Sequence, residues 1–217
     1  MTLHPRAILF DLDGTLVHSS IDFEIMREGI RRVAADHGVD RARLARRDVL
    51  GLLEDACALA AENGERVRRA AEDVLLEEER RAAEEATVDD DARALLDDVR
   101  ASGRAIGIVT RNSRHIVEPL LARLGLACDT LVAREDTPRA KPAPIHVRIA
   151  LVRLRTSPRH AYLVGDHAMD ALGGRRAGVR TFGVPTRGDP EHRAFEAARP
   201  DVMLARLGEL RAHFGPA

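Results

Sequence analysis

The sequence has little that would direct the chain to a membrane, a thiolate metal site or a nucleic acid. No apolar run of its 217 residues approaches the roughly 20 that a membrane span needs, and the N-terminus has no signal-peptide pattern. The two cysteines, Cys57 and Cys128, lack metal-ligand spacing, so we expect small buried apolar side chains, with no disulfide or zinc site. The net charge of −1, with both signs interspersed, argues against a nucleic-acid partner. We therefore expect a cytoplasmic protein without membrane or nucleic-acid partners; the sequence predicts no oligomeric state.

Lysine is the scarcest charged residue. The chain has 34 basic residues, and Lys141 is the only lysine among them. An ammonium is a compact charge on a flexible stem, whereas a guanidinium is a rigid planar fork, so position 141 has a candidate role that arginine would not serve. A GC-rich coding sequence can also leave a single lysine, so composition alone assigns no role to Lys141.

The order of apolar patterns predicts an α/β protein with a helical insertion. Residues 7–10 form a short apolar run that predicts a buried strand, and residues 21–86 then show helical spacing with breaks at Gly38 and Gly64. From residue 88 onward, helical and strand patterns alternate, which predicts a largely parallel sheet. The predicted strands are 7–10, 106–109, 130–133, 162–164, 181–184 and 201–204. The predicted helices are 92–102, 115–124, one that follows a Pro-rich turn at 141–144 and runs to about 154, and 169–177, with a closing helix. We expect a Rossmann-like core of residues 1–17 and 88–217, with helices on both faces of its sheet, and a helical domain of residues 18–87.

Polar residues follow the predicted strands, and the carboxyl ends of parallel strands meet at one edge of a sheet. These residues are Asp11, Asp13, Gly14, Thr15, Thr110, Arg111, Asn112, Lys141, Gly165, Asp166 and Asp170. Clustered carboxylates repel one another unless a cation offsets them, and Mg²⁺ prefers such oxygen ligands. An aspartate nucleophile, a second carboxylic acid and nearby cations are what phosphoryl transfer needs. The pattern therefore predicts a magnesium-dependent enzyme that acts on a small phosphorylated metabolite.

Four segments carry a resemblance to a known family. Residues 8–16, 108–112, 141–144 and 164–170 resemble, in order and spacing, the four motifs of the haloacid dehalogenase-like hydrolase superfamily. The similarity is to the branch that contains phosphoglycolate phosphatase and β-phosphoglucomutase. It implies that the helical domain is a cap, which closes over the core, selects the leaving group and excludes water.

The resemblance also implies a role for each motif residue. Asp11 would be the nucleophile and a metal ligand, and Asp13 the general acid and base, with its backbone carbonyl on the metal. Asp166 would bind the metal directly, and Asp170 through water, or it would orient Lys141. Lys141 would bridge the nucleophile and the phosphate. The remaining phosphate-binding or substrate-binding residues would be Gly14, Thr15, Thr110, Arg111 and Asn112.

Several alternatives stay open on the sequence alone. A calcium loop at residues 11–15 would continue with further acidic positions, which are absent. Asp13 disfavours dehalogenation, and the absence of lysine from the helical domain disfavours phosphonate cleavage. A sugar-phosphate mutase and a non-catalytic regulatory protein remain as alternatives to a phosphatase. His18 is interpreted as a solvated loop residue and His167 as a residue outside the site, while Arg111 is either a carboxylate clamp or a surface residue.

Overall fold

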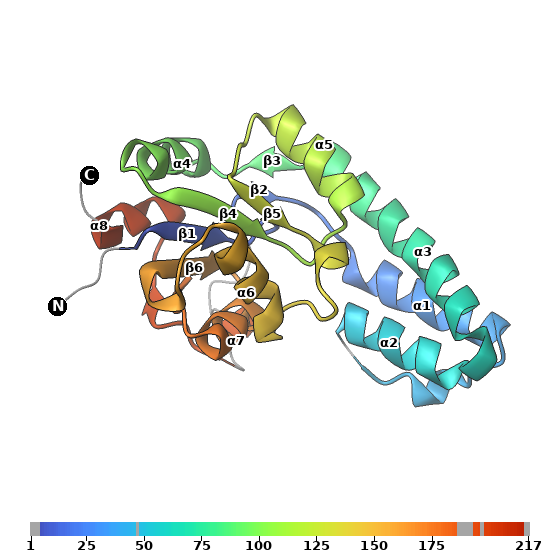
Figure 1. Ribbon diagram of the computed structural model, residues 1–217. Coiled ribbons are helices and arrows are strands. Elements are labelled where there is room, and N and C mark those ends of the chain that lie inside the picture. The colour runs from blue at the N-terminus through green and yellow to red at the C-terminus, as the bar shows by residue number, and fades with distance from the viewer. Residues whose placement is uncertain (1–4, 47, 186–192, 196–197, 215–217) are drawn as a thin grey trace. The chain divides into compact units, whose positions relative to one another are not determined.

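The computed structural model describes residues 5–46, 48–185, 193–195 and 198–214 (Figure 1). The chain forms two compact units. The α/β unit consists of Met1–Ser19 and Ala86–Ala217, and the helical unit consists of Ser20–Glu85. The chain thus leaves the α/β unit after its first two strands and returns to it after the three α-helices of the helical unit.

A parallel sheet of six strands is the centre of the α/β unit, with the order β5-β4-β1-β6-β7-β8. The strands are β1 (Ala7–Phe10), β4 (Ala105–Val109), β5 (Thr130–Val132), β6 (Ala161–Gly165), β7 (Arg180–Gly183) and β8 (Val202–Met203). All four residues of β1 are fully buried, because β1 pairs with β4 on one side and β6 on the other. A strand buried on both faces reads as a continuous apolar run, which explains why the sequence predicts it well.

Helices cover both faces of this sheet, as predicted. They are α4 (Ala92–Ala101), α5 (Arg114–Leu124), α6 (Pro144–Arg153), α7 (Ala168–Ala177) and the short α8 (Arg211–Phe214). Figure 1 shows α6 and α7 on one side of the sheet and α4 on the other. Leu9 and Leu163 of the sheet pack in one buried cluster with Val147 of α6 and Ala177 of α7. The predicted α/β fold class is confirmed.

A second sheet of two very short strands was not predicted. In it, β2 (Val17–His18) pairs antiparallel with β3 (Thr87–Val88), on either side of the segment that forms the helical unit. Two-residue strands carry no periodicity, and this pairing depends on a contact across the whole insertion, so no local pattern signals it. His18 and Thr87 therefore pair as strand residues within the α/β unit.

The helical unit contains α1 (Phe23–Asp36), α2 (Val49–Leu59) and α3 (Gly64–Glu85), with 3-10 turns at Arg41–Arg43 and Ala61–Asn63. Ile30, Leu52 and Leu75, one from each helix, are fully buried in its core. Within the described part of the chain, no helix has both the length and the apolar character of a membrane span. Cys57 is buried here as expected, whereas Cys128 of the α/β unit is only half-buried, so the expectation of two buried cysteines was wrong for Cys128.

Candidate active site

The only lysine of the chain lies between two aspartates. Asp11 directly follows β1, and its backbone N–H donates to the Val164 carbonyl of β6. Lys141 Nζ lies 2.7 Å from Asp11 Oδ1 and 2.6 Å from Asp170 Oδ1. The Lys141 side chain is only 1% exposed, and the stem passes Gly173 of α7, where an added Cβ would lie 3.5 Å from Lys141 Cγ. A buried ammonium at this distance forms a close ion pair with each of the two carboxylates.

Burial and mutual repulsion shape the ionisation of this group. Burial and the neighbouring Asp170 charge raise the pKa of Asp11 to about 7, although Lys141 lowers it. Burial alone would lower the pKa of Lys141, but the charges of Asp11 and Asp170 raise it above its ordinary value. The site therefore holds more negative charge than its one ammonium offsets, so a further cation is favourable here.

Three carboxylates are placed to bind such a cation. Asp11, Asp166 and Asp170 each offer one oxygen, and these oxygens lie within 4.8 Å of one another. The Gly14 backbone, with φ of +82°, approaches Asp166 so closely that an added Cβ would lie 2.1 Å from Asp166 Oδ2. The donor set consists of carboxylate oxygens, which bind hard divalent cations. These residues fit a divalent metal.

Asp13 lies beside this cluster and is fixed through both carboxylate oxygens. Ser19 Oγ donates to Asp13 Oδ1 at 2.6 Å, and Asn112 Nδ2 donates to Asp13 Oδ2 at 3.4 Å. Burial raises the pKa of Asp13, and these two hydrogen bonds oppose that effect. Sequence reasoning missed Ser19 as a site residue and placed Asn112 among the phosphate-binding residues. The structure shows Asn112 in contact with Asp13.

The loop after β4 brings Thr110, Arg111 and Asn112 to the same edge of the sheet. Thr110 is buried, and its Oγ1 accepts the Asn112 N–H at 3.1 Å, which leaves the hydroxyl hydrogen to donate. Thr15 Oγ1, from the β1 loop, donates to Asp166 Oδ1 at 3.5 Å. Arg111 Nη1 lies 2.5 Å from Met169 Sδ, in the segment that follows β6. Arg111 is thus directed toward the first turn of α7, which also carries Asp170.

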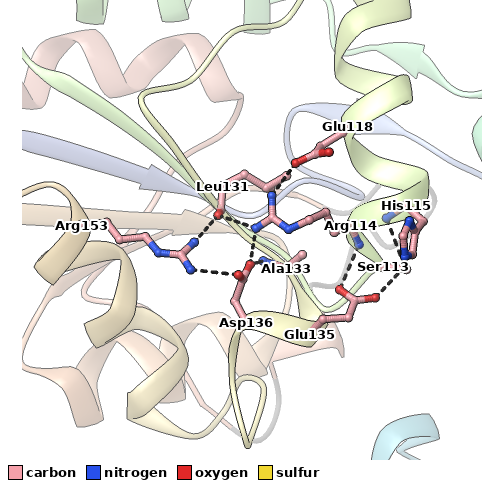
Figure 2. Close-up of polar contacts among 9 residues, drawn as sticks. All are labelled: Ser113, Arg114, His115, Glu118, Leu131, Ala133, Glu135, Asp136 and Arg153. Carbon is pink, nitrogen blue, oxygen red and sulfur yellow. Dashed lines mark hydrogen bonds and ion pairs between the residues drawn. The ribbon is translucent and has the colours of Figure 1, made fainter.

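A polar network joins the end of the loop after β4 to the segment after β5 (Figure 2). Ser113, the N-cap of α5, donates to Glu135 Oε1 at 2.6 Å, and the Arg114 N–H donates to Glu135 Oε2 at 3.0 Å. Asp136 accepts from the guanidinium groups of Arg114 and Arg153 and from the Ala133 N–H. The loops after β4 and β5 are therefore bound to each other, which holds the Thr110–Asn112 segment in place.

Three histidines near the site have distinct roles. His18 Nε2 lies 3.2 Å from Asp89 Oδ2, so it pairs with a carboxylate and is not the solvated loop residue we expected. His167 is exposed and N-caps α7, where its Nδ1 accepts the Met169 N–H and its own N–H donates to Asp170 Oδ2. His146, on α6, is fully buried and accepts the Lys141 N–H on Nδ1. Sequence reasoning missed His146.

The sequence matches the family model of the haloacid dehalogenase-like hydrolases over residues 5–178, most of the chain. The chain belongs to the haloacid dehalogenase-like hydrolases. All four predicted motif segments lie within the matched range. The predicted family is thus confirmed, and with it an enzyme of the hydrolase class.

Two curated relatives of this haloacid dehalogenase-like hydrolase are a phosphatase and a pyrophosphatase. The chain is 30% identical to validoxylamine A 7'-phosphate phosphatase of Streptomyces hygroscopicus subsp. limoneus, over 97% of this chain and 99% of that protein. It is 37% identical to pyrophosphatase PpaX of Bacillus velezensis, but that match covers only 53% of this chain and 54% of that protein. Together with the family match, the phosphatase relative confirms the predicted enzyme class, a phosphoric monoester hydrolase of the haloacid dehalogenase-like type.

The fold of this haloacid dehalogenase-like hydrolase is also found among solved structures. A haloacid dehalogenase-like hydrolase from Bacteroides fragilis superposes with a TM-score of 0.70 at 24% identity, covering 95% of this chain and 100% of that one. This likeness supports the fold, while the roles of the individual site residues remain predictions.

Proposed function

We propose that this chain is a Mg²⁺-dependent phosphatase that hydrolyses a small phosphorylated metabolite through a phosphoaspartate at Asp11. The observation that carries the proposal is the buried Lys141 ammonium, held 2.7 Å from Asp11 and 2.6 Å from Asp170 beside a third carboxylate, Asp166. The ammonium holds a carboxylate oxygen of Asp11 in one orientation. It is also a fixed positive charge for the oxygens of a phosphoryl group on that carboxylate.

The proposed reaction has two steps. In the first, an Asp11 oxygen attacks phosphorus, the bond to the leaving oxygen breaks, and the Asp13 carboxylic acid protonates that oxygen. In the second, Asp13 as carboxylate removes a proton from water, which attacks the phosphorus of the acyl phosphate and restores Asp11. The hydrogen bonds from Ser19 and Asn112 keep Asp13 in one rotamer through both steps.

Asp11, Asp166 and Asp170 would hold Mg²⁺, with the Asp13 backbone carbonyl as a further ligand. When bound, the ion neutralises the negative charge that develops on the phosphoryl oxygens. Asp170 also contacts Lys141 directly, so we assign it the second task of orienting the ammonium. Asp166, which accepts from Thr15, would be a direct ligand.

Phosphate oxygens would accept from Lys141 and from Thr110 Oγ1. The predicted phosphate-binding residues Gly14 and Thr15 use their backbone N–H groups within the turn, where they donate to the Val17 and Leu12 carbonyls. We propose Arg111 as a substrate contact rather than a surface residue. The helical unit is proposed as the cap domain, which selects the substrate. Phosphoglycolate is a candidate substrate by resemblance to the branch, and a cytoplasmic location stays a prediction that cell fractionation tests.

Hydrolysis of p-nitrophenyl phosphate tests the proposal. The wild type should turn over this compound with Mg²⁺ and lose activity with EDTA, and Asp11→Asn should lose it while keeping the fold. Asp97→Asn is the matched control, because Asp97 on α4 is 81% exposed and its exchange should leave the rate unchanged. No turnover of p-nitrophenyl phosphate or of a broad panel of phosphorylated metabolites would contradict the proposal. Release of inorganic phosphate, as opposed to an isomerised sugar phosphate, separates hydrolysis from mutase activity.

A further inference from the structure

A buried histidine binds the backbone of the only lysine. His146 lies in the first turn of α6 and is fully buried. Its Nδ1 is 3.1 Å from the Lys141 backbone nitrogen, across the Lys141–Ala143 turn. None of the four motif segments includes His146, and the reaction proposed above does not use it.

This hydrogen bond fixes the protonation state of the imidazole. A backbone N–H can only donate, so Nδ1 must accept, and the neutral ring carries its proton on Nε2. Burial and the neighbouring Lys141 charge lower the pKa of His146 to about 3. His146 is therefore a neutral acceptor at physiological pH and does not itself supply or remove protons there.

The Lys141 N–H depends on this acceptor. Lys141 is 2% exposed, so its backbone N–H is shielded from water, and a buried N–H without a partner is costly. Other contacts hold the turn at neighbouring residues, since the Ala143 N–H donates to the Ala140 carbonyl and Arg176 donates to the Pro142 carbonyl. Among the described residues, only His146 accepts from the backbone N–H of Lys141, whose ammonium lies between Asp11 and Asp170.

We propose that His146 is a positioning residue for Lys141, which fixes the backbone from which the ammonium reaches Asp11 and the substrate phosphate. The inference rests on the proposed function for the role of Lys141. Losing the hydrogen bond shifts the start of the lysine stem, and small misplacements in a site of this kind lower rates strongly. The hydrogen-bond acceptor at the Nδ1 position is what matters, so a residue that supplies an acceptor there should replace histidine.

Three exchanges at position 146 distinguish the effect of the hydrogen-bond acceptor from the effect of side-chain size and shape. His146→Asn places an amide oxygen near the Nδ1 position, whereas the oxygen of His146→Gln lies one bond too far, and His146→Leu has none. We expect the affinity for inorganic phosphate, measured by calorimetry with Mg²⁺, and kcat for p-nitrophenyl phosphate to fall about tenfold in the Leu and Gln variants. The Asn variant should stay within about threefold of wild type. If the Leu variant does not fold, the Gln variant, which keeps a polar side chain, still tests the role of the hydrogen-bond acceptor.

A double-mutant cycle tests whether His146 acts through Lys141. In a Lys141→Met background, His146→Gln should change phosphate affinity by less than about twofold, because the group it positions is gone. Thr181→Val is the control for a purely structural loss. Thr181 is equally buried and its Oγ1 donates to Asp201 at 2.8 Å, so this exchange should lower the melting temperature but not phosphate affinity.

Equal effects of His146→Gln with and without Lys141, or an Asn variant as impaired as the Leu variant, would overturn the positioning role. These outcomes are distinct from failure of the proposed function, which is read from the absence of wild-type turnover. Even if the wild type shows no turnover, the double-mutant cycle on phosphate affinity still tests whether His146 acts through Lys141.

Discussion

Replacing Lys141 is the exchange to which the site should respond most sharply. Lys141→Met keeps the length and apolar stem of the side chain but removes the ammonium that lies between Asp11 Oδ1 and Asp170 Oδ1. Lys141→Arg keeps the charge but replaces a compact group with a larger planar one. The ammonium is buried and lies 2.7 and 2.6 Å from the two carboxylates, so a larger planar guanidinium cannot occupy the same point without displacing them.

The expected loss in rate follows from the two ion pairs of the ammonium. Removing one preorganised donor from a developing phosphoryl charge typically costs about 3–4 kcal/mol, which is a factor of about 10²–10³ in rate. We therefore expect kcat/KM for p-nitrophenyl phosphate to fall by at least about 10² in Lys141→Met and by at least about 10 in Lys141→Arg. Breaking a buried ion pair also lowers the free energy of unfolding by about 3–5 kcal/mol in metal-free buffer. Saturating Mg²⁺ should recover part of this stability, because it offsets the unpaired carboxylates.

Steady-state kinetics and urea unfolding, each with and without Mg²⁺, measure these two effects separately. Arg148→Lys, a charge-conserving exchange at an exposed position of α6, is the matched control and should change neither. Lys141→Met that retains activity within about threefold of wild type would refute the assigned role of the ammonium. Equal activity of Lys141→Arg and wild type would refute the argument from shape.

Two further exchanges test the backbone and the electrostatics around the site. Gly14→Ala should abolish Mg²⁺ binding, measured by calorimetry, and should destabilise the protein, because its Cβ would lie 2.1 Å from Asp166 Oδ2. Gly38→Ala is the control, since Gly38 has nearly the same φ of +83° but no neighbour within 4 Å. Its free energy of unfolding should fall by only about 1 kcal/mol. An unfolding free energy that drops equally in both variants would contradict the close-approach argument. Although burial raises the pKa of Asp136, hydrogen bonds from Arg153, the Ala133 N–H and Arg114 lower it to about 2. The stability that Asp136 contributes is complete above its unfolded-state pKa of 3.8 and is lost as pH falls through about 2. Asp136→Asn should therefore lower the free energy of unfolding by about 2 kcal/mol at pH 7 and by progressively less in acid. The control Asp97→Asn should show no such dependence on pH.

The sheet and its helices were predictable because local patterns determine them. Buried strands such as β1 and β6 are short apolar runs that end at polar residues, and Gly125 ends α5 in a left-handed conformation. In contrast, β2 and β3 have two residues each, and their pairing depends on where the chain re-enters the α/β unit. No window of local sequence contains that information.

The site was predictable in outline but not in its supporting contacts. Asp11 and Asp166 follow directly after strands, so their convergence is a consequence of topology. His146 and Ser19 act through the direction of one side chain, which depends on helix rotation and rotamer choice rather than on residue order. His167, which the sequence analysis interpreted as a residue outside the site, caps α7 and donates its backbone N–H to Asp170, a contact that residue order does not signal. A histidine five residues after a lone lysine is the only signal that could have suggested His146.

Trapping the covalent intermediate tests the central claim most directly. Enzyme quenched during turnover and treated with sodium borohydride converts an acyl phosphate to homoserine, which mass spectrometry locates on the tryptic peptide of residues 7–27. The account predicts reduction at Asp11, none at Asp13 in the same peptide, and none without substrate. Full turnover with no reduced residue, or reduction at a different carboxylate, would contradict a phosphoaspartate at Asp11.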